Sequence, residues 1–363
     1  MNGPIPPDEI DRLNSICERG AWTGRQAALP TPIKLKTLAE FCREYVALAY
    51  AVEPIVRTSS LYTLTARTGH GKTAFLVAGT LAIATGRPDI LGLEVTRGRV
   101  AFLTFENPDD VRMRFMIAAY ALNVDLEEIC GDIVILDARF KPEEVLAALV
   151  KDAETSPFTF VVIDTLAAFF DGDDPNDAKQ GGEFMRRLRP LTKIAGNPAV
   201  VVAAHPVKNA AEDNLLPYGS GAVLNEVDGN LTLWKGGEGV VTLGWQGKLR
   251  GLDFEPKPFR FELLSSPDLL DAKGRQFMLP VMRPTSIETA QEKQDQDNDL
   301  NRALLKTMRE NPAGTQAEWA MAIGRAKGRV NDRLQKLKKL KLVEEALGKW
   351  RLTSKGQKEA ENS

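Results

Sequence analysis

The stretch Leu61-Tyr62-Thr63-Leu64-Thr65-Ala66-Arg67-Thr68-Gly69-His70-Gly71-Lys72-Thr73 decides the fold of this chain. An apolar strand, 61–65, leads into a segment of the form A-x-x-x-x-G-K-T, which is a phosphate-binding loop whose usual pattern opens with Gly. Gly69 and Gly71 lack a Cβ, so the backbone can curl and aim successive N–H groups at phosphate oxygens. The apolar run from Ala74 to Thr85 predicts a helix that ends at Gly86.

This pattern assigns a role to each part of the loop. Lys72 is expected to reach the β- and γ-phosphates of ATP, and the Thr73 hydroxyl to bind Mg²⁺. The N-terminus of the following helix adds a partial positive charge under the phosphates. The residues expected around the nucleotide are Ala66, Arg67, Thr68, Gly69, His70, Gly71, Lys72, Thr73 and Ala74. A Gly-rich turn that binds nothing is the alternative, and the order of strand, GKT and helix favours phosphate.

Length and composition indicate an ordinary globular protein. The 363 residues favour one large domain and one small one, with 43% hydrophobic and 26% charged residues. No apolar run approaches the ~18 residues that a membrane helix needs, and residues 1–9 carry no basic region followed by an apolar core. Cys17, Cys42 and Cys130 lie too far apart for a metal site or a disulfide framework. We therefore expect a cytoplasmic protein with no membrane contact.

The charge is distributed unevenly along the chain. Residues 301–358 contain 15 Lys/Arg and 5 Asp/Glu, a net charge of +10, whereas the whole chain carries −2 and the remainder therefore −12. A basic C-terminal region on an acidic body indicates that this region meets a polyanion.

Three further apolar runs, 100–105, 158–163 and 199–204, are each followed directly by a polar residue. Continuous apolar runs are typical of strands buried on both faces of a parallel sheet, and such sheets bind ligands at the carboxyl ends of their strands. Asp164 is expected to hold Mg²⁺. Glu106, placed on the strand next to the phosphate loop, is expected to orient and deprotonate the attacking water. His205 is expected beside them. A surface carboxylate and a satisfied core histidine are the alternatives for Glu106 and His205.

The remaining pattern up to residue 264 alternates helices and strands, as an α/β fold does. The acidic segment 171–177 is interpreted as a solvated loop that caps the next helix, with a metal site as the alternative. Residues 209–225 are expected to form a mobile loop and a short helix beside the site. Helices are expected at 8–19, 35–51, 109–121, 142–153 and from 178. Strands are expected at 133–136, 231–234, 240–245 and, as the last strand, 259–264. The strands 231–234 and 240–245 are expected to form a hairpin.

The C-terminal part has its own pattern. Predicted boundaries are an N-terminal arm (1–34), the α/β domain (35–264), a polar linker (265–300), a small domain (301–358) and a tail (359–363). In the small domain a helix at 304–310, a capping box at Thr315–Glu318 and a helix at 328–340 precede a β-hairpin, which is the order of a winged helix-turn-helix. The face of the third helix is predicted to be Val330, Leu334, Leu337 and Leu340.

Basic residues on or near this third helix are the candidates for nucleic-acid contact. They are Arg325, Lys327, Arg329, Arg333 and Lys336. Placed there, they could meet phosphates or a major groove. A winged helix that binds protein, or simply a solvated basic face, remains open.

The strand-end motifs, taken together over about residues 35–263, resemble the RecA-like ATPases of the RepA type, the hexameric plasmid and phage replicative helicases related to DnaB-like helicases. These motifs are the phosphate loop, Phe102–Pro108, Val162–Thr165 and Val202–His205. The resemblance implies a RecA-like core, ATP hydrolysis at subunit interfaces, and single-stranded DNA threaded through a hexameric ring. It assigns Lys72 and Thr73 to phosphate and Mg²⁺, Glu106 to the base, Asp164 to Mg²⁺, and His205 to sensing the γ-phosphate.

Related helicases also insert a Lys-x-Arg from the neighbouring subunit, and Lys248-Leu249-Arg250 matches that spacing. RepA-type proteins tend to carry Arg-Gly before the Ser at the segment written here as Tyr218-Gly219-Ser220. Tyr218 cannot serve as an arginine finger, so that role falls to Arg250. An exposed basic pair after a strand is the alternative interpretation of Lys248 and Arg250.

Three functions fit this sequence. The first is a ring-forming, ATP-driven DNA helicase or translocase of plasmid or phage replication that binds single-stranded DNA and, through the tail, duplex DNA. The second is a RecA-like ATP switch that loads, mediates or regulates without unwinding. The third is a small-molecule kinase, against which the Lys-x-Arg argues.

Overall fold

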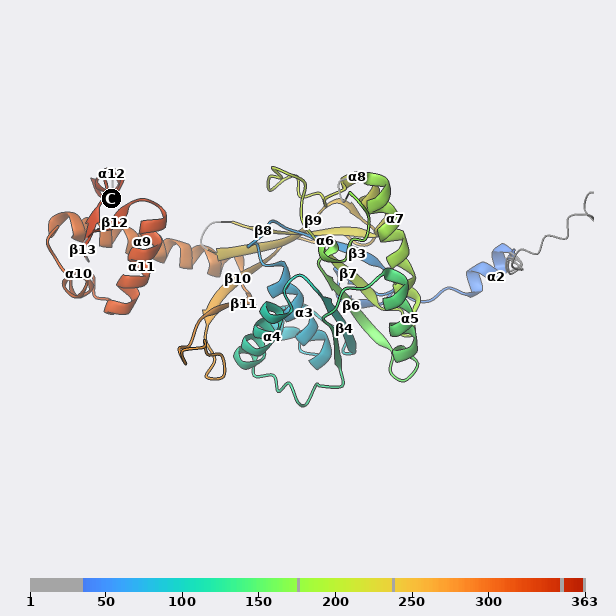
Figure 1. Ribbon diagram of the computed structural model, residues 1–363. Helices are drawn as coiled ribbons and strands as arrows, with labels where there is room; N and C mark the ends of the chain where they lie inside the picture. The colour runs from blue at the N-terminus through green and yellow to red at the C-terminus, as the bar shows by residue number, and fades with distance from the viewer. Residues whose placement is uncertain (1–34, 175–176, 237–238, 347–348, 362–363) are drawn as a thin grey trace, which may run out of the picture. The chain divides into compact units, whose positions relative to one another are not determined.

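The computed structural model describes residues 35–361 except 175–176, 237–238 and 347–348 (Figure 1). The described residues divide into two units at Ala47, namely 35–47 and the residues from 48 onward. The expected arm at 1–34 and its helix at 8–19 lie outside the described residues. No helix in the described part is long and apolar enough to cross a membrane.

The helix expected at 35–51 is much shorter than predicted. Helix α2 spans Leu38–Arg43 and begins with a capping box between Thr37 and Glu40. Strand β1 (Tyr50–Val52) then pairs antiparallel with β2 (Val56–Arg57) around Pro54. Proline disfavours a helical conformation in the residue before it, and the β-branched residues on either side favour extended backbone.

One nine-stranded sheet organises the second unit, with the strand order β11-β10-β9-β8-β3-β7-β6-β4-β5. The six strands from β8 to β5 in this order are parallel, and β9, β10 and β11 continue the sheet antiparallel. The strands are β3 (Leu61–Thr65), β4 (Arg99–Thr104), β5 (Ile133–Leu136), β6 (Phe158–Asp164), β7 (Ala199–Ala204), β8 (Gly229–Lys235), β9 (Val240–Leu249), β10 (Lys257–Leu264) and β11 (Leu279–Pro284). This confirms an α/β fold with a mixed, largely parallel sheet.

The strand order corrects one expectation. Glu106 follows β4, and β4 is separated from the phosphate-loop strand β3 by β7 and β6. Strand β3 is buried along its whole length between β7 and β8. Apolar runs of similar composition do not indicate which strand pairs with which. The strands were therefore recognisable in the sequence, but their order in the sheet was not.

Helices cover both faces of the sheet (Figure 1). One face packs on α3 (Lys72–Thr85) and α4 (Pro108–Leu122), and the other on α5 (Pro142–Ala153) and α7 (Ala178–Leu188). Helix α3 ends at Gly86, whose φ of 68° is the left-handed conformation that glycine adopts easily. The shorter elements are η1 (Pro88–Ile90), α6 (Leu166–Phe169), η2 (Arg189–Lys193) and α8 (Ser220–Glu226). The acidic loop caps α7 as expected, because the Asp177 side chain accepts a hydrogen bond from the Gln180 backbone N–H.

Part of the expected linker at 265–300 has regular structure. Strand β11 extends the main sheet by pairing with β10, so 259–264 is not its last strand. Met282 on β11 and Phe261 on β10 pack so closely on the phosphate loop that a Cβ at Gly71 would collide with both. Residues 265–278 of the expected linker form turns between β10 and β11, whereas residues 287–300 belong to helix α9 (Ile287–Glu310). Its polar composition concealed a helix that continues into the C-terminal core.

The C-terminal region has three helices followed by a hairpin, in the expected order. Helices α9, α10 (Gln316–Ala322) and α11 (Lys327–Lys339) precede β12 (Val343–Ala346) and β13 (Lys349–Leu352). The capping box of Thr315 and Glu318 is confirmed. The winged-helix assignment itself stays a prediction.

Two details of this region differ from expectation. Helix α12 (Ser354–Glu361) was not predicted; it follows the hairpin and extends into the tail expected at 359–363, and its Ala360 is buried in a core that includes Trp319 and Trp350. Leu340 is 55% exposed, whereas Val330, Leu334 and Leu337 are buried as predicted. Leu340 is the C-cap residue just beyond the end of α11, so it does not continue the buried face of the helix.

Candidate functional site

The phosphate loop connects the end of β3 to the start of α3. Gly69 and Gly71 take left-handed φ angles of 79° and 95°, which only glycine adopts without strain. Lys72, the first residue of α3, is 7% exposed, and its Nζ donates to the Ala66 carbonyl at 2.7 Å. Burial lowers the pKa of Lys72 to about 8, an effect that the negative charges of Asp164 and Glu106 partly oppose. Lys72 is therefore folded back across the loop that would hold the phosphates.

Asp164 lies at the end of β6 and faces the first turn of α3. The Thr73 hydroxyl donates to Asp164 Oδ2 at 2.8 Å. Asp164 is 4% exposed, and its Oδ1 is buried with no hydrogen-bond partner in the described part of the chain. Burial raises the pKa of Asp164, while the hydrogen bond from Thr73 and the charge of Lys72 oppose that rise.

These donors fit a magnesium ion. Mg²⁺ prefers oxygen ligands, and it is commonly bound by one or two protein oxygens together with substrate phosphates. A buried carboxylate oxygen without a partner is costly unless something else binds it. Thr73 and Asp164 would hold the ion, in line with the prediction from sequence. In the described residues no group of three or more His, Cys, Asp or Glu side chains forms a separate metal site.

Glu106 joins this group from the neighbouring strand. The Thr165 hydroxyl, directly after Asp164, donates to Glu106 Oε2 at 3.1 Å. Thr165 is buried whereas Glu106 is exposed. A buried hydroxyl thus fixes the orientation of an exposed carboxylate that water can reach. Thr165 was not predicted to have this role, although its place after the strand-end aspartate was a usable signal.

His205 follows β7, the strand between β3 and β6. Burial lowers the pKa of His205, and the positive charge of Lys72 lowers it further, while Glu106 opposes both. Its imidazole is therefore neutral near pH 7. The strand order places His205 at the same ends of the parallel strands as Lys72 and Asp164, and His205 interacts electrostatically with Lys72 and Glu106.

The tip of the phosphate loop is held by β8. His70 Nδ1 accepts a hydrogen bond from the Lys235 backbone N–H at 3.1 Å, and its ring meets the Trp234 ring edge-on with centroids 4.9 Å apart. The Arg67 guanidinium lies over Trp234 and donates to the Ala210 carbonyl. Thr68 is exposed and Ala74 buried. Arg67 and His70 therefore tie the loop to its surroundings.

Asn230 is a buried polar residue that no motif in the sequence marks. Its Oδ1 accepts from Thr63 and Thr65 of β3 at 3.0 and 2.6 Å. Its Nδ2 donates to the carbonyls of Leu215 and Gln246 at 2.9 and 3.0 Å. Asn230 thereby links β3, β8, β9 and the segment after His205. Its carbonyl and both amide hydrogens are satisfied, which is what burial of such a side chain requires.

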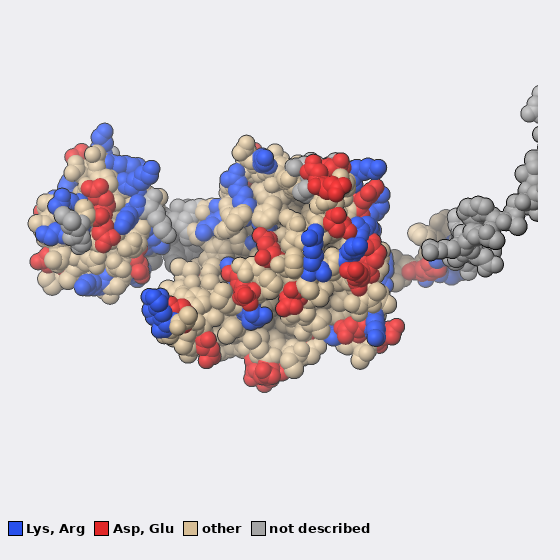
Figure 2. All heavy atoms as spheres, in the orientation of Figure 1, with Lys and Arg blue, Asp and Glu red and all other residues tan. Residues whose placement is uncertain are grey.

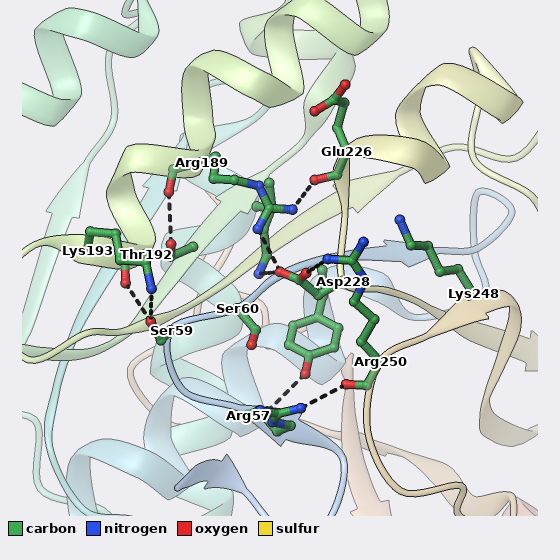
Figure 3. Close-up of polar contacts among 12 residues, drawn as sticks. Arg57, Ser59, Ser60, Arg189, Thr192, Lys193, Glu226, Asp228, Lys248 and Arg250 are labelled. Carbon is green, nitrogen blue, oxygen red and sulfur yellow. Dashed lines mark hydrogen bonds and ion pairs between the residues drawn. The ribbon is translucent and has the colours of Figure 1, made fainter. Parts of the chain in front are cut away.

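Lys248 and Arg250 lie beside the amino ends of the parallel strands, away from the ends that carry the phosphate loop (Figure 3). Lys248 Nζ donates to the Leu224 and Asn225 carbonyls in the last turn of α8, both at 2.9 Å. The Arg250 guanidinium pairs with Asp228 at 3.1 Å and is 63% exposed. Asp228 in turn binds the start of β3, whereas the phosphate loop follows its end. Within one chain, the structure does not bring these two residues to Lys72.

The basic residues of the C-terminal region are placed differently from one another. Arg325, Lys327, Arg329 and Lys336 are exposed, on or just before α11. Arg333 is only 7% exposed, so its assignment as a surface contact is wrong. It lies on the face of α11 that carries Val330, Leu334 and Leu337 into the core. Figure 2 shows Lys and Arg side chains at several places on this region, with Asp and Glu between them.

Comparison with known proteins agrees with the geometry of the phosphate-loop edge. Residues 31–211 match a family model described as "AAA domain". No curated protein matches the chain. The matched segment includes the phosphate loop, Glu106, Asp164, Thr165 and His205, and ends before β8. Residues 31–211 therefore form a domain of this P-loop NTPase family, which implies binding and hydrolysis of ATP with Mg²⁺.

Proposed function

We propose that this protein is a ring-forming DNA helicase or translocase that hydrolyses ATP between its subunits. The observation that carries the proposal is the position of Arg250. It lies beside the start of strand β3, whereas the phosphate loop of the same chain follows the end of that strand. Strand β3 is five residues long, and a strand rises about 3.3 Å per residue. Its two ends are too far apart for one chain to supply both Lys72 and Arg250 to one nucleotide.

The residues of the phosphate-loop edge have distinct tasks in this proposal. Backbone N–H groups of the loop and Lys72 bind and orient the phosphates, a role that the start of α3 supports. Glu106, held by Thr165, orients a water molecule and accepts its proton. Bound Mg²⁺ would neutralise charge that develops on the phosphate oxygens. His205, neutral near pH 7, can exchange hydrogen bonds with a γ-phosphate and respond to its loss.

Arg250 of a neighbouring subunit completes the site. Arginine presents a charged, planar group suited to phosphate oxygens, and such a finger supplied in trans raises hydrolysis by about 10³–10⁵-fold. Lys248 is occupied with carbonyls of α8, so we assign it to holding the turn before Asp228 rather than to the phosphate. A single-chain kinase would leave Arg250 with its ion pair to Asp228 but without a catalytic role.

Mixing two inactive variants tests the arrangement between subunits. Arg250→Ala keeps its phosphate loop and base but lacks the finger, whereas Glu106→Gln keeps the finger but lacks the base. We expect each alone to lose hydrolysis while binding nucleotide, and the mixture to recover activity where the two kinds of subunit meet. No recovery at any ratio, in a mixture shown to be co-assembled because a tag on one variant co-purifies the other, would contradict the role in trans.

The C-terminal region is proposed to contact DNA through the exposed basic residues around the start of α11. Removing residues 311–363 would cut α9 free of its partners, so point substitutions are the sharper test. Replacing Lys327 and Arg329 with Gln should weaken binding to DNA and reduce the slope of log K against log salt by about 0.9 for each phosphate that is no longer neutralised. An unchanged slope would assign this region to a protein partner.

The first experiment is ATP hydrolysis with and without single-stranded DNA, with the assembly mass measured in the same buffer. Hydrolysis stimulated by DNA in a hexamer, the assembly that the resembling helicases form, supports the motor; strand separation would be measured next. Hydrolysis that ignores DNA, by a monomer or dimer, would overturn the motor and favour an ATP-dependent switch that loads or regulates another protein.

A further inference from the structure

We propose that Asp228 is the positioning residue for Arg250, and that it connects this arginine to the phosphate loop of its own chain through strand β3. The proposal rests on the proposed role of Arg250 at the neighbouring subunit's nucleotide. Asp228 does not touch that nucleotide, and it lies directly before β8 at the start of the parallel strands. Its effect is on where the guanidinium of Arg250 points.

Each oxygen of Asp228 has a different task. Oδ1 pairs with Arg250 at 3.1 Å, and Oδ2 accepts from Arg189 at 2.8 Å and from the Leu61 backbone N–H at 2.9 Å. Figure 3 shows the two guanidinium groups approaching the carboxylate from different sides, while no contact is drawn from Lys248 to it. The side chain of Asp228 is 11% exposed. A carboxylate held by three donors is a fixed reference point for a long, otherwise adaptable arginine.

The backbone reinforces the same connection. The Asp228 N–H donates to the Leu61 carbonyl at 2.6 Å, and the Arg250 N–H donates to the Asp228 carbonyl at 2.6 Å. Arg57 donates to the Arg250 carbonyl at 3.4 Å. The end of β9, the start of β8 and the start of β3 therefore meet at one residue. Arg250 keeps 63% of its side chain exposed, so it is aimed but still accessible to another subunit.

Strand β3 gives this arrangement a consequence for the whole assembly. Leu61, its first residue, is bound twice by Asp228, and Thr65, its last, is followed directly by Ala66 of the phosphate loop. A fully buried strand is a rigid element, because packed interiors do not deform gradually. A displacement of the phosphate loop along β3 would therefore move Asp228 and the arginine offered to the next subunit.

A double-mutant cycle tests whether Asp228 acts through Arg250. The variants are Asp228→Asn, Arg250→Ala and the double variant, with kcat, KM for ATP and assembly mass measured for each. We expect Asp228→Asn to lower kcat by about 100-fold, the loss typical of a misplaced catalytic group, with KM nearly unchanged. In the double variant kcat should equal that of Arg250→Ala alone, because two residues that act as a unit are not additive.

Arg189→Gln is the matched control. It removes the other ion pair at the same carboxylate, and with it any general stabilising effect of that pair, but leaves Oδ1 bound to Arg250. We expect it to keep most of kcat. If Asp228→Asn fails to assemble, Asp228→Glu replaces it, since this change keeps the charge and displaces it by one methylene.

The outcomes separate this inference from the function on which it rests. Full activity of Arg250→Ala would overturn the proposed role in trans. If Arg250→Ala is inactive but Asp228→Asn keeps its kcat, only the positioning role fails. The same follows if the two effects add in the double variant, or if Asp228→Asn and Arg189→Gln lower kcat equally, because both results indicate a general structural effect.

Discussion

The buried charged groups at the two ends of the parallel strands differ in how many partners they have. At the carboxyl end, Asp164 keeps a buried oxygen without a partner in the described residues, and burial lowers the pKa of Lys72 to about 8. At the amino end, Asp228 is bound by two arginines and a backbone N–H. Burial alone would raise the pKa of Asp228, but these bonds hold it below its ordinary value.

This difference distinguishes a ligand-binding site from a structural support, which we call a brace. Buried groups that lack partners are unfavourable in the empty protein, so a ligand that supplies those partners gains affinity. Groups that are already satisfied fix geometry and gain little from a ligand. The carboxyl end therefore has the properties of a binding site, and the amino end those of a support that holds Arg250 in place for another subunit.

The largest effect is expected from Lys72→Ala. Loss of this cation should leave no measurable hydrolysis, because a preorganised charge that meets phosphate contributes at least about 10²–10³-fold and also binds the substrate. The melting temperature should not fall, since the variant also removes a desolvated ammonium group. Hydrolysis at the normal rate would contradict the phosphate-loop assignment.

Glu106→Gln should lower kcat by about 10²–10⁴-fold, the usual loss when a general base is removed. Nucleotide binding should persist, because Glu106 is expected to contact water rather than phosphate. Thr165→Val, which removes the hydrogen bond to Glu106 and retains the shape of the side chain, should lower kcat by about tenfold. If Thr165→Val had no effect while Glu106→Gln abolished turnover, Thr165 would not be positioning the base.

The same contrast predicts opposite changes in stability. At pH 7, Asp228→Asn should lower the free energy of unfolding by about 2 kcal/mol, because the neutral amide offers only one acceptor oxygen to the two arginines and the buried Leu61 N–H. Asp164→Asn should leave it unchanged or raise it, since a carboxylate whose pKa is raised by burial is destabilising when ionised. Chemical denaturation without nucleotide measures both. Equal decreases in the two variants would remove the distinction between site and brace.

The sequence was most informative where one local signal decides the structure. Strands β5 and β7 and helix α5 were predicted with the bounds that the structure has. The capping box of Thr315 and the stop at Gly86 were also correct, because each depends on neighbouring residues only. The order of the strands was not accessible in this way, and Glu106 was consequently placed one strand from the phosphate loop instead of three.

The site was predicted through its strand ends, and it was incomplete where long-range contacts decide. Lys72, Thr73, Glu106, Asp164 and His205 gather at one edge as expected. Asp228 and Asn230 lie in no motif, and Thr165 lies in one that assigned it no role, since their importance comes from partners up to 167 residues away. Arg333 was misassigned because charge alone does not reveal which helix face a basic residue occupies. Strand β11 was missed because its residues lie in a largely polar segment.

The smallest expected effect is a pH dependence of ATP binding. The phosphates favour the charged form of Lys72, whose pKa in the free protein is about 8. Above that pH, binding must be accompanied by uptake of a proton, so the Kd for ATP should rise by up to about tenfold per pH unit. A lysine with an ordinary pKa would show no such change until about pH 10. Calorimetric titration between about pH 7.5 and 9.5 covers the range in which the two cases differ.

Lys72→Arg is the control for this titration, because a guanidinium stays charged throughout the range. Its Kd should be independent of pH, even if the longer side chain weakens binding overall. A flat profile in the unmodified protein would show that Lys72 is fully charged before nucleotide arrives. In that case the carboxyl end would be as well satisfied as the amino end, and the contrast between them would rest on Asp164 alone.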